Sequence, residues 1–287
     1  MRRHVSMLFA LVACMGLAAC GDDDDGGGDG GTTAAADSAA ALTFVLSGSG
    51  RATDLTVEGE PAAGLTEITF RNETRGDHEA QLVRVEGQQS EAAVLRQFGQ
   101  TGEGAPTPDW LRAAGGAGQA GAGQEVSSTQ VLEPGAYYAI DTAGGRRPAF
   151  VRFEVTGDAS DAELPAADAT ITARDFSFTS SGLRAGVNEV TFDNTGREIH
   201  HVIAFPLAEG RTEADFRRFI ASDGRGGGPP PVDFERGTGS SAFDGGTSGN
   251  VQLRLVRGDY VLVCFISNRA GGPPHATFGM VNEVTVE

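Results

Sequence analysis

Short runs in which apolar and polar residues alternate, each closed by turn residues, recur along most of the chain. Residues 188–193 are one such run, in which Val190 and Phe192 alternate with polar side chains, the period of a strand with one buried face. Residues 261–263 are continuously apolar, as in a strand buried on both faces. With 42 glycines and 12 prolines between such runs, the pattern predicts an all-β chain with long loops.

The chain repeats itself at an offset of 122 residues. GLTEITFRN at 64–72 matches GVNEVTFDN at 186–194 without a gap, and the same offset aligns Ser90 with Thr212. Serine and threonine are good helix N-caps, and each is followed by a short segment with helical character. The sequence therefore predicts a tandem duplication of two Greek-key β-sandwiches, each with one short helix in a long loop.

Composition sets the boundaries of the predicted parts. Residues 1–19 hold two arginines and an apolar run too short to span a bilayer comfortably, which predicts a signal peptide. Residues 20–40 are rich in glycine and aspartate without apolar periodicity, and predict a flexible tether. The repeats are expected at 41–156 and 169–287, joined by a polar linker at 157–168.

Cys20 directly follows the apolar run, in the sequence LAACG. This segment resembles the lipobox of bacterial lipoproteins, in which the cysteine becomes the lipidated first residue after cleavage. The alternative is an ordinary signal peptide that leaves Cys20 as a free thiol. The lipobox reading implies a protein anchored to the cell membrane on its extracytoplasmic face.

The chain is acidic, with a formal net charge of −17. Repulsion from phosphates makes nucleic acid an unsuitable partner, whereas a basic protein would be attracted. The four aspartates at 22–25 are interpreted as a solvated, self-repelling run. Charge therefore favours a protein partner without identifying it.

Residues that ligate soft metals are scarce and gather in the second repeat. Of the three cysteines, Cys14 lies in the predicted signal and Cys20 at its end, so Cys264 is the only one in the predicted domains. Met280 is likewise the only methionine beyond the signal. An unpaired cysteine in an exported protein calls for a reason, because such cysteines are usually paired or lost. A thiolate and a thioether together with imidazoles select copper.

In its motifs the second repeat resembles the cupredoxins, the plastocyanin and azurin superfamily of blue copper proteins. The shared motifs are NTG before a histidine, GDY leading into a cysteine, then PH and GM. The resemblance implies one type 1 copper ion, cycling between Cu(I) and Cu(II), held by His200, Cys264, His275 and Met280. The ten residues between Cys264 and His275 form a longer loop than in plastocyanin, a departure that bears on the exposure and potential of the site.

The repeat chooses between two adjacent histidines. Neighbouring strand residues point to opposite faces, so His200 and His201 do not easily face the same ion. The first repeat keeps a histidine, His78, at the position of His200 only. We therefore expect His200 to be the ligand, with His201 and Asn194 supporting the site by contacts behind the ligands.

The first repeat lacks the other ligands. Asp141 stands at the position of Cys264, and neither histidine nor methionine follows it. His78 and Asp141 alone are too few to hold a harder metal, so a structural role is expected for this repeat.

These features predict a membrane-anchored blue-copper electron carrier. Copper oxidases and nitrite reductases need a second centre with several further histidines, and the sequence holds no catalytic triad, P-loop or HExxH helix, so no enzyme is expected. The expected partner is a redox protein, such as a c-type cytochrome or a membrane oxidoreductase. The alternatives are copper storage, delivery or sensing, and a metal-free cupredoxin-like interaction module.

Overall fold

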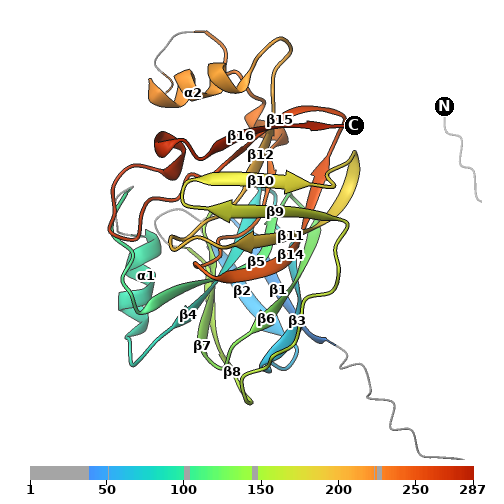
Figure 1. Ribbon diagram of the computed structural model, residues 1–287. Helices are drawn as coiled ribbons and strands as arrows, with labels where there is room; N and C mark the ends of the chain where they lie inside the picture. The colour runs from blue at the N-terminus through green and yellow to red at the C-terminus, as the bar shows by residue number, and fades with distance from the viewer. Residues whose placement is uncertain (1–38, 51, 100–103, 144–147, 223, 225–227) are drawn as a thin grey trace, which may run out of the picture. The chain divides into compact units, whose positions relative to one another are not determined.

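The computed structural model describes residues 39–287 except 51, 100–103, 144–147, 223 and 225–227 (Figure 1). The predicted signal peptide, Cys20 and nearly all of the predicted tether lie outside the described residues. The described residues belong to one compact unit. None of the helices described in it is both long enough and apolar enough to cross a membrane.

The all-β prediction is confirmed, and so is one short helix in each repeat. In the first repeat the elements are β1 Ala40–Ser49, β2 Ala52–Glu58, β3 Gly64–Asn72, β4 His78–Val85, α1 Glu91–Gly99, β5 Leu111–Ala120, β6 Glu125–Leu132, β7 Gly135–Asp141 and β8 Phe150–Val155. In the second they are β9 Ala169–Arg174, β10 Ser177–Ser181, β11 Gly186–Asn194, β12 Ile203–Pro206, α2 Glu213–Ala221, η1 Phe234–Arg236, β13 Thr238–Gly239, β14 Thr247–Leu255, β15 Gly258–Val263, η2 His275–Phe278 and β16 Val281–Val286.

Both helices begin where the N-cap residues predict. Thr212 forms a capping box with Asp215, in which each side chain accepts a hydrogen bond from the other residue's backbone N–H. Ser90 Oγ accepts from the backbone N–H of Ala93 at 3.2 Å at the start of α1. The caps satisfy donors that a helix start leaves free, which explains why these short segments are helical.

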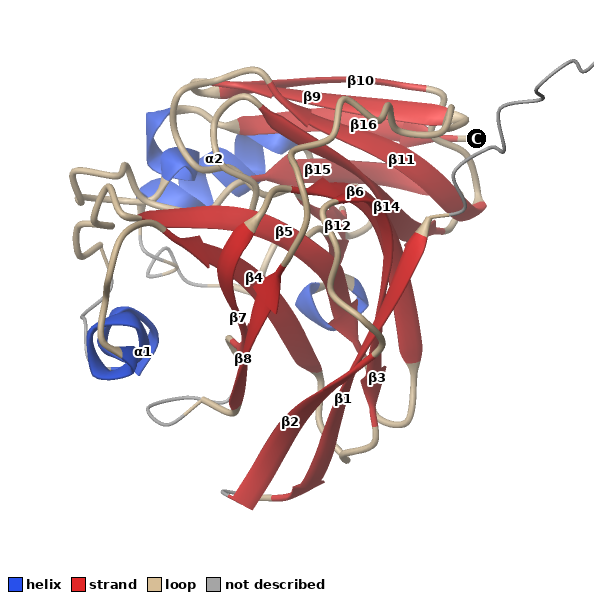
Figure 2. Cartoon of the chain, turned by 90° about the horizontal axis from the view of Figure 1, so that it is seen from below, coloured by secondary structure: helices blue, strands red, loops and turns tan. Residues whose placement is uncertain are grey.

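Each repeat packs two sheets around a core, and the repeats share one of the sheets. The shared sheet has the order β10-β9-β11-β14-β6-β3-β1-β2, and each repeat adds a four-stranded sheet, β5-β4-β7-β8 or β13-β12-β15-β16. The junction is the antiparallel pair of β14 and β6, which lie side by side in Figure 2. Pairing two strands that would otherwise be edges satisfies their backbone groups and removes a surface prone to aggregation.

Burial follows the predicted periods. On β11 the side chains of Val190 and Phe192 are fully buried in the core of the second repeat. The central strand β15 is buried at every position from Tyr260 to its end, as its continuous apolar sequence predicts. Cys264 follows at the end of this strand, inside the core.

A second apolar cluster attaches α2 to the outer face of β15 through Phe216, which is fully buried. Phe216→Ala is expected to lower the free energy of unfolding by about 3–5 kcal/mol, because truncation of a buried phenylalanine leaves a cavity. Urea unfolding measures this change. The half-buried neighbour Phe219 provides the matched control, and an equal loss in Phe219→Ala would contradict the anchoring role of Phe216.

Candidate metal centre

The second repeat brings three of the predicted ligands together from distant parts of the chain. His200 lies in the turn after β11, Cys264 directly follows β15, and His275 opens η2. All three are buried, and one ligand atom of each lies within 4.8 Å of those of the others. The residues are separated by up to 75 positions, so the sandwich itself assembles the cluster.

The distances within the cluster are those of ligands around one ion. Cys264 Sγ lies 3.7 Å from His200 Nδ1 and 3.5 Å from His275 Nδ1, and the two nitrogens are 3.1 Å apart. Metal bonds of about 2.0–2.1 Å to nitrogen and about 2.3 Å to sulfur, at angles of about 100–120°, would separate the donors by about 3.1–3.8 Å. A single ion therefore fits between the three atoms.

The outer nitrogen of each imidazole is held by a side-chain oxygen. His200 Nε2 donates to Asp175 Oδ1 at 2.9 Å, and His275 Nε2 donates to Asn268 Oδ1 at 3.1 Å. With a proton on Nε2, each neutral ring presents the lone pair of Nδ1 to the centre of the cluster. Two converging lone pairs repel each other, and a cation between them converts that repulsion into coordination.

Burial determines the protonation of the cluster. Loss of hydration lowers the pKa of His275 to about 4 and shifts the pKa of His200 below its usual value, so both rings are neutral near neutral pH. Burial also raises the pKa of the Cys264 thiol to about 12, so without a cation it stays protonated. A metal would have to displace this proton, because the thiolate is the form that ligates.

Met280 is fully buried in the same core cluster as Cys264. Its backbone N–H donates to His275 O at 3.1 Å, and its carbonyl accepts from the Cys264 N–H at 3.3 Å. These two bonds place the residue beside both ligands at the end of η2.

His201 points to a different target from His200, as strand alternation predicts. Its Nε2 accepts a hydrogen bond from the backbone N–H of Phe265 at 3.0 Å, one residue beyond Cys264. Burial lowers the pKa of His201 to about 4, which keeps this nitrogen free to accept. His201 therefore fixes the backbone that carries the thiol.

Asn194 braces the turn before His200. Its amide donates to the carbonyls of Glu198 and Phe243, both at 2.9 Å. The NTG motif also requires its glycine, because a Cβ at Gly196 would lie 3.1 Å from His200 Nε2 and also contact Asp175.

Sequence reasoning missed Asp175 and Asn268. Asp175 lies between β9 and β10, 25 residues before His200, and Asn268 lies within the long loop after Cys264. Both positions read as ordinary turn residues in the sequence, and no spacing rule connects them with a histidine. Only the folded arrangement shows that they orient the rings.

The first repeat has a two-residue contact at the positions of His200 and Cys264, without the soft donors. His78 Nδ1 contacts Asp141 Oδ2 at 2.9 Å, and Asp141 is fully buried. His78 and Asp141 thus satisfy each other's hydrogen-bonding groups. In the second repeat, by contrast, the donor atoms of His200, Cys264 and His275 face one another.

The donor set of the second repeat fits copper. Two imidazole nitrogens and one thiolate in a roughly trigonal arrangement are the ligands of blue copper sites, with a weak thioether as the axial group. The core cluster that contains Cys264 and Met280 is apolar.

Comparisons with known proteins give similarities of fold only. No protein-family model matches the chain, and no curated protein matches it in sequence. A structure of auracyanin B is 20% identical over 41% of this chain and 86% of that chain, with a TM-score of 0.27. A reduced auracyanin from the photosynthetic bacterium Roseiflexus castenholzii is 19% identical over 41% and 94%, with a TM-score of 0.27. A Cu-containing nitrite reductase from Thermus scotoductus SA-01 is 11% identical over 87% and 61%, with a TM-score of 0.22.

The placement of the donors decides the family resemblance. One histidine comes from an early turn, while cysteine, histidine and methionine come from the segment between β15 and β16, the order that the resemblance predicted. In the order and placement of these donors the second repeat resembles the cupredoxins. Its candidate metal centre is a buried His-Cys-His cluster with a methionine beside it in the core.

Copper binding to this cupredoxin-like centre is expected to release about one proton per ion near neutral pH, because the thiol is protonated and the rings are neutral. Affinity should rise about tenfold per pH unit between about pH 6 and 9, and fall further below about pH 4, where His275 gains a proton. Calorimetry in buffers of different ionisation enthalpy counts the protons. Release unchanged in Cys264→Ser would contradict the assignment of the proton to the thiol.

Proposed function

We propose that the protein is a blue-copper electron carrier, with one type 1 copper ion in the second repeat held by His200, Cys264, His275 and the axial Met280. The observation that carries this proposal is the buried cluster of two Nδ1 atoms and one Sγ at ligand distances. Copper bound there would supply a one-electron couple between Cu(I) and Cu(II).

The chain's own residues would keep the ligands still during electron transfer. The hydrogen bonds from the histidines to Asp175 and Asn268 fix the planes of both rings, and His201 fixes the strand that carries the thiol. A site held from outside changes little when its charge changes, and small rearrangement favours rapid transfer. One electron would arrive from a reduced donor protein and leave to an oxidised acceptor.

Full burial favours an electron carrier over a copper storage, delivery or sensing protein. The three clustered ligands have no exposed surface, so handing the ion to another protein would require the core to open. Electrons need no such opening. Phe176 lies 4.9 Å from the His275 ring and 5.3 Å from the Phe278 ring, which is 48% exposed, so these contacts connect the buried site with the surface.

We also infer that the chain is not an enzyme. Within the part of the chain that the structure describes, the only group of three or more histidine, cysteine or carboxylate ligands close enough to hold an ion is the cluster itself. Multicopper catalysis needs a further centre at which substrate is bound. A metal-free interaction module is disfavoured, because it would give no reason for three buried donor atoms to face one another.

The N-terminal segment and the charge support a proposal for location and partner. Lipidation of Cys20 would hold the protein at the extracytoplasmic face of the cell membrane, with the segment between Cys20 and β1 as a tether. The net charge of −17 favours a basic partner, such as a c-type cytochrome or a membrane oxidoreductase.

The blue-copper proposal predicts an intense visible absorption band when Cu(II) is added to the purified protein. Cys264→Ser should lose the band entirely, because the band arises from charge transfer between the thiolate and copper. The matched control is His78→Ala, which removes the aligned histidine of the first repeat and should keep the band. A band that survives in Cys264→Ser would overturn the proposal.

The anchor predicts that membrane fractionation separates two variants. Cys20→Ala should move the protein from the membrane to the soluble fraction, because the acylated residue is lost. Cys14→Ala, within the predicted signal, should leave it on the membrane. Equal membrane association of Cys20→Ala and the unchanged protein would rule out the anchor.

A further inference from the structure

The long loop between Cys264 and His275 is attached to the first repeat by Arg269. Its guanidinium donates to the carbonyls of Pro108 at 3.2 Å and Leu111 at 3.0 Å, which lie just before and at the start of β5. The backbone adds two bonds, from the N–H of Thr107 to Arg269 O and from the N–H of Gly272 to Gly104 O, both at 2.9 Å. The loop that departs most from plastocyanin is therefore held by the other repeat.

The same guanidinium also binds the segment that pairs with His200. It donates to both carboxylate oxygens of Asp244, at 2.8 and 2.6 Å. The Arg269 side chain is 16% exposed and that of Asp244 9%, so this pair is mostly shielded from water. A planar group with five donors can reach two carbonyls and a carboxylate at once, which lysine cannot do.

The residues just before Asp244 connect it with His200 and with β4 of the first repeat. Phe243 and His200 exchange two backbone hydrogen bonds, at 2.8 and 3.0 Å. On the other side, Gln81 of β4 accepts from the Ala242 N–H at 2.7 Å and donates to the Ala242 carbonyl at 3.0 Å. A side chain of the first repeat thus holds the backbone adjacent to the partner of His200.

Packing fixes this segment as firmly as its hydrogen bonds. The Phe243 ring lies over β5 and β14, where a Cβ at Gly115 would come within 2.6 Å of it and a Cβ at Gly249 within 2.8 Å. The two glycines leave room for the ring, so the backbone of both repeats approaches it closely.

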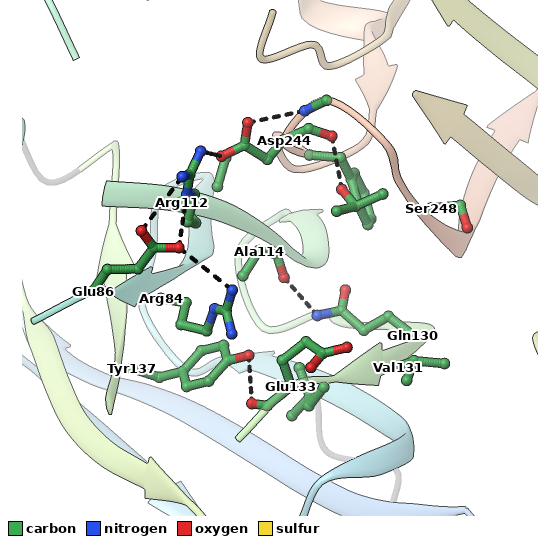
Figure 3. Close-up of a pocket in the computed structure, with 15 residues that line it drawn as sticks. Arg84, Glu86, Arg112, Ala114, Gln130, Val131, Glu133, Tyr137, Asp244 and Ser248 are labelled. Atoms are coloured by element: carbon green, nitrogen blue, oxygen red, sulfur yellow. Dashed lines mark hydrogen bonds and ion pairs between the residues drawn. The ribbon is translucent and has the colours of Figure 1, made fainter. Parts of the chain in front are cut away.

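The pocket beside this junction shows the charges that stabilise it (Figure 3). It has a volume of about 330 Å³ and is lined by both repeats. Arg112 of β5 lies between Glu86, at 3.0 Å, and Asp244, at 4.0 Å. Asp244 therefore faces arginines from the first repeat and from the ligand loop.

The residues that hold the two imidazoles are chain neighbours of the residues in these contacts. Asn268, which holds the ring of His275, is the residue before Arg269, and Phe243, which holds the backbone of His200, is the residue before Asp244. We propose that Arg269 is a positioning residue through which the first repeat, without a metal of its own, holds both histidine ligands of the second. This inference rests on the proposed copper function.

Two variants test the proposal from opposite sides of the junction. Arg269→Gln removes the hydrogen bonds by which the loop is attached to the first repeat. Gln81→Leu changes only a side chain of the first repeat and removes its hydrogen bonds to Ala242. Each variant is expected to weaken Cu(II) binding about tenfold, which is the smallest effect usually seen when a contact behind a metal ligand is removed. Each should also change the visible and electron paramagnetic resonance spectra. Competition with a chelator measures the affinity.

A measurement on the metal-free protein separates positioning from general stability. Amide hydrogen exchange in Arg269→Gln should accelerate at Thr107, Gly272 and His275, whose N–H groups bond across or within the loop, and stay unchanged on β1 and β3. The control Arg184→Gln, which removes an exposed pair with Asp168, should alter neither exchange nor copper affinity. Uniformly faster exchange would assign Arg269 to stability alone and overturn its positioning role.

The outcomes separate failure of the Arg269 role from failure of the proposed copper function. If the unchanged protein shows no thiolate-to-copper band, the proposed function fails, and the positioning of a copper ligand fails with it. If the band is present and both variants bind copper within twofold of the unchanged protein, with the same spectra, only the positioning role is overturned. If Arg269→Gln does not fold, Arg269→Lys replaces it. Lysine keeps the positive charge opposite Asp244 but lacks the planar set of N–H donors that a guanidinium offers.

Discussion

The burial of two neutral imidazoles and a thiol at mutual distances of 3.1–3.7 Å is the constraint on which the second repeat depends. Polar groups taken out of water must find partners, and their inner atoms find only one another. The outer nitrogens therefore bond to Asp175 and Asn268, which fixes the rings and directs their lone pairs inward. A thiophilic cation satisfies all three donors at once, whereas no single protein side chain would.

The first repeat has the same fold without such a site. In the first repeat an aspartate replaces the cysteine, and His78 bonds directly to Asp141. This pair needs no ion, so the strand arrangement persists while the chemistry is lost. What that repeat gains is contact with its neighbour, through the shared sheet and through β5, where the segment before Asp244 is bound.

The shared sheet explains why the repeats form one compact unit. Antiparallel pairing of β14 with β6 joins two edges that would otherwise be open, and the turn that pairs with His200 packs along the edge of β5. Long loops are usually mobile, and a ligand at the end of one would move with it. Attachment to a second sandwich gives the loop that ends at His275 a rigid support.

The sequence by itself determined the elements and the order of the candidate ligands. Strand periods, N-caps at Ser90 and Thr212, and the internal repeat are local or repeated patterns, so they can be read without a structure. The repeat also selected His200 over His201, because strand alternation is a local rule. Cys264 stood out because it is the only cysteine in the predicted domains.

Only the tertiary structure decided what holds those ligands. Asp175, Asn268 and Arg269 act through contacts between segments far apart in the chain, and Gln81 lies 161 residues from the backbone it binds. Such contacts follow no period, because they depend on how the sheets pack and where the edges meet. For the same reason the sequence did not predict that the two repeats join into one sheet. Any exposed strand edge presents the same backbone groups, and only packing selects the strand that pairs with it.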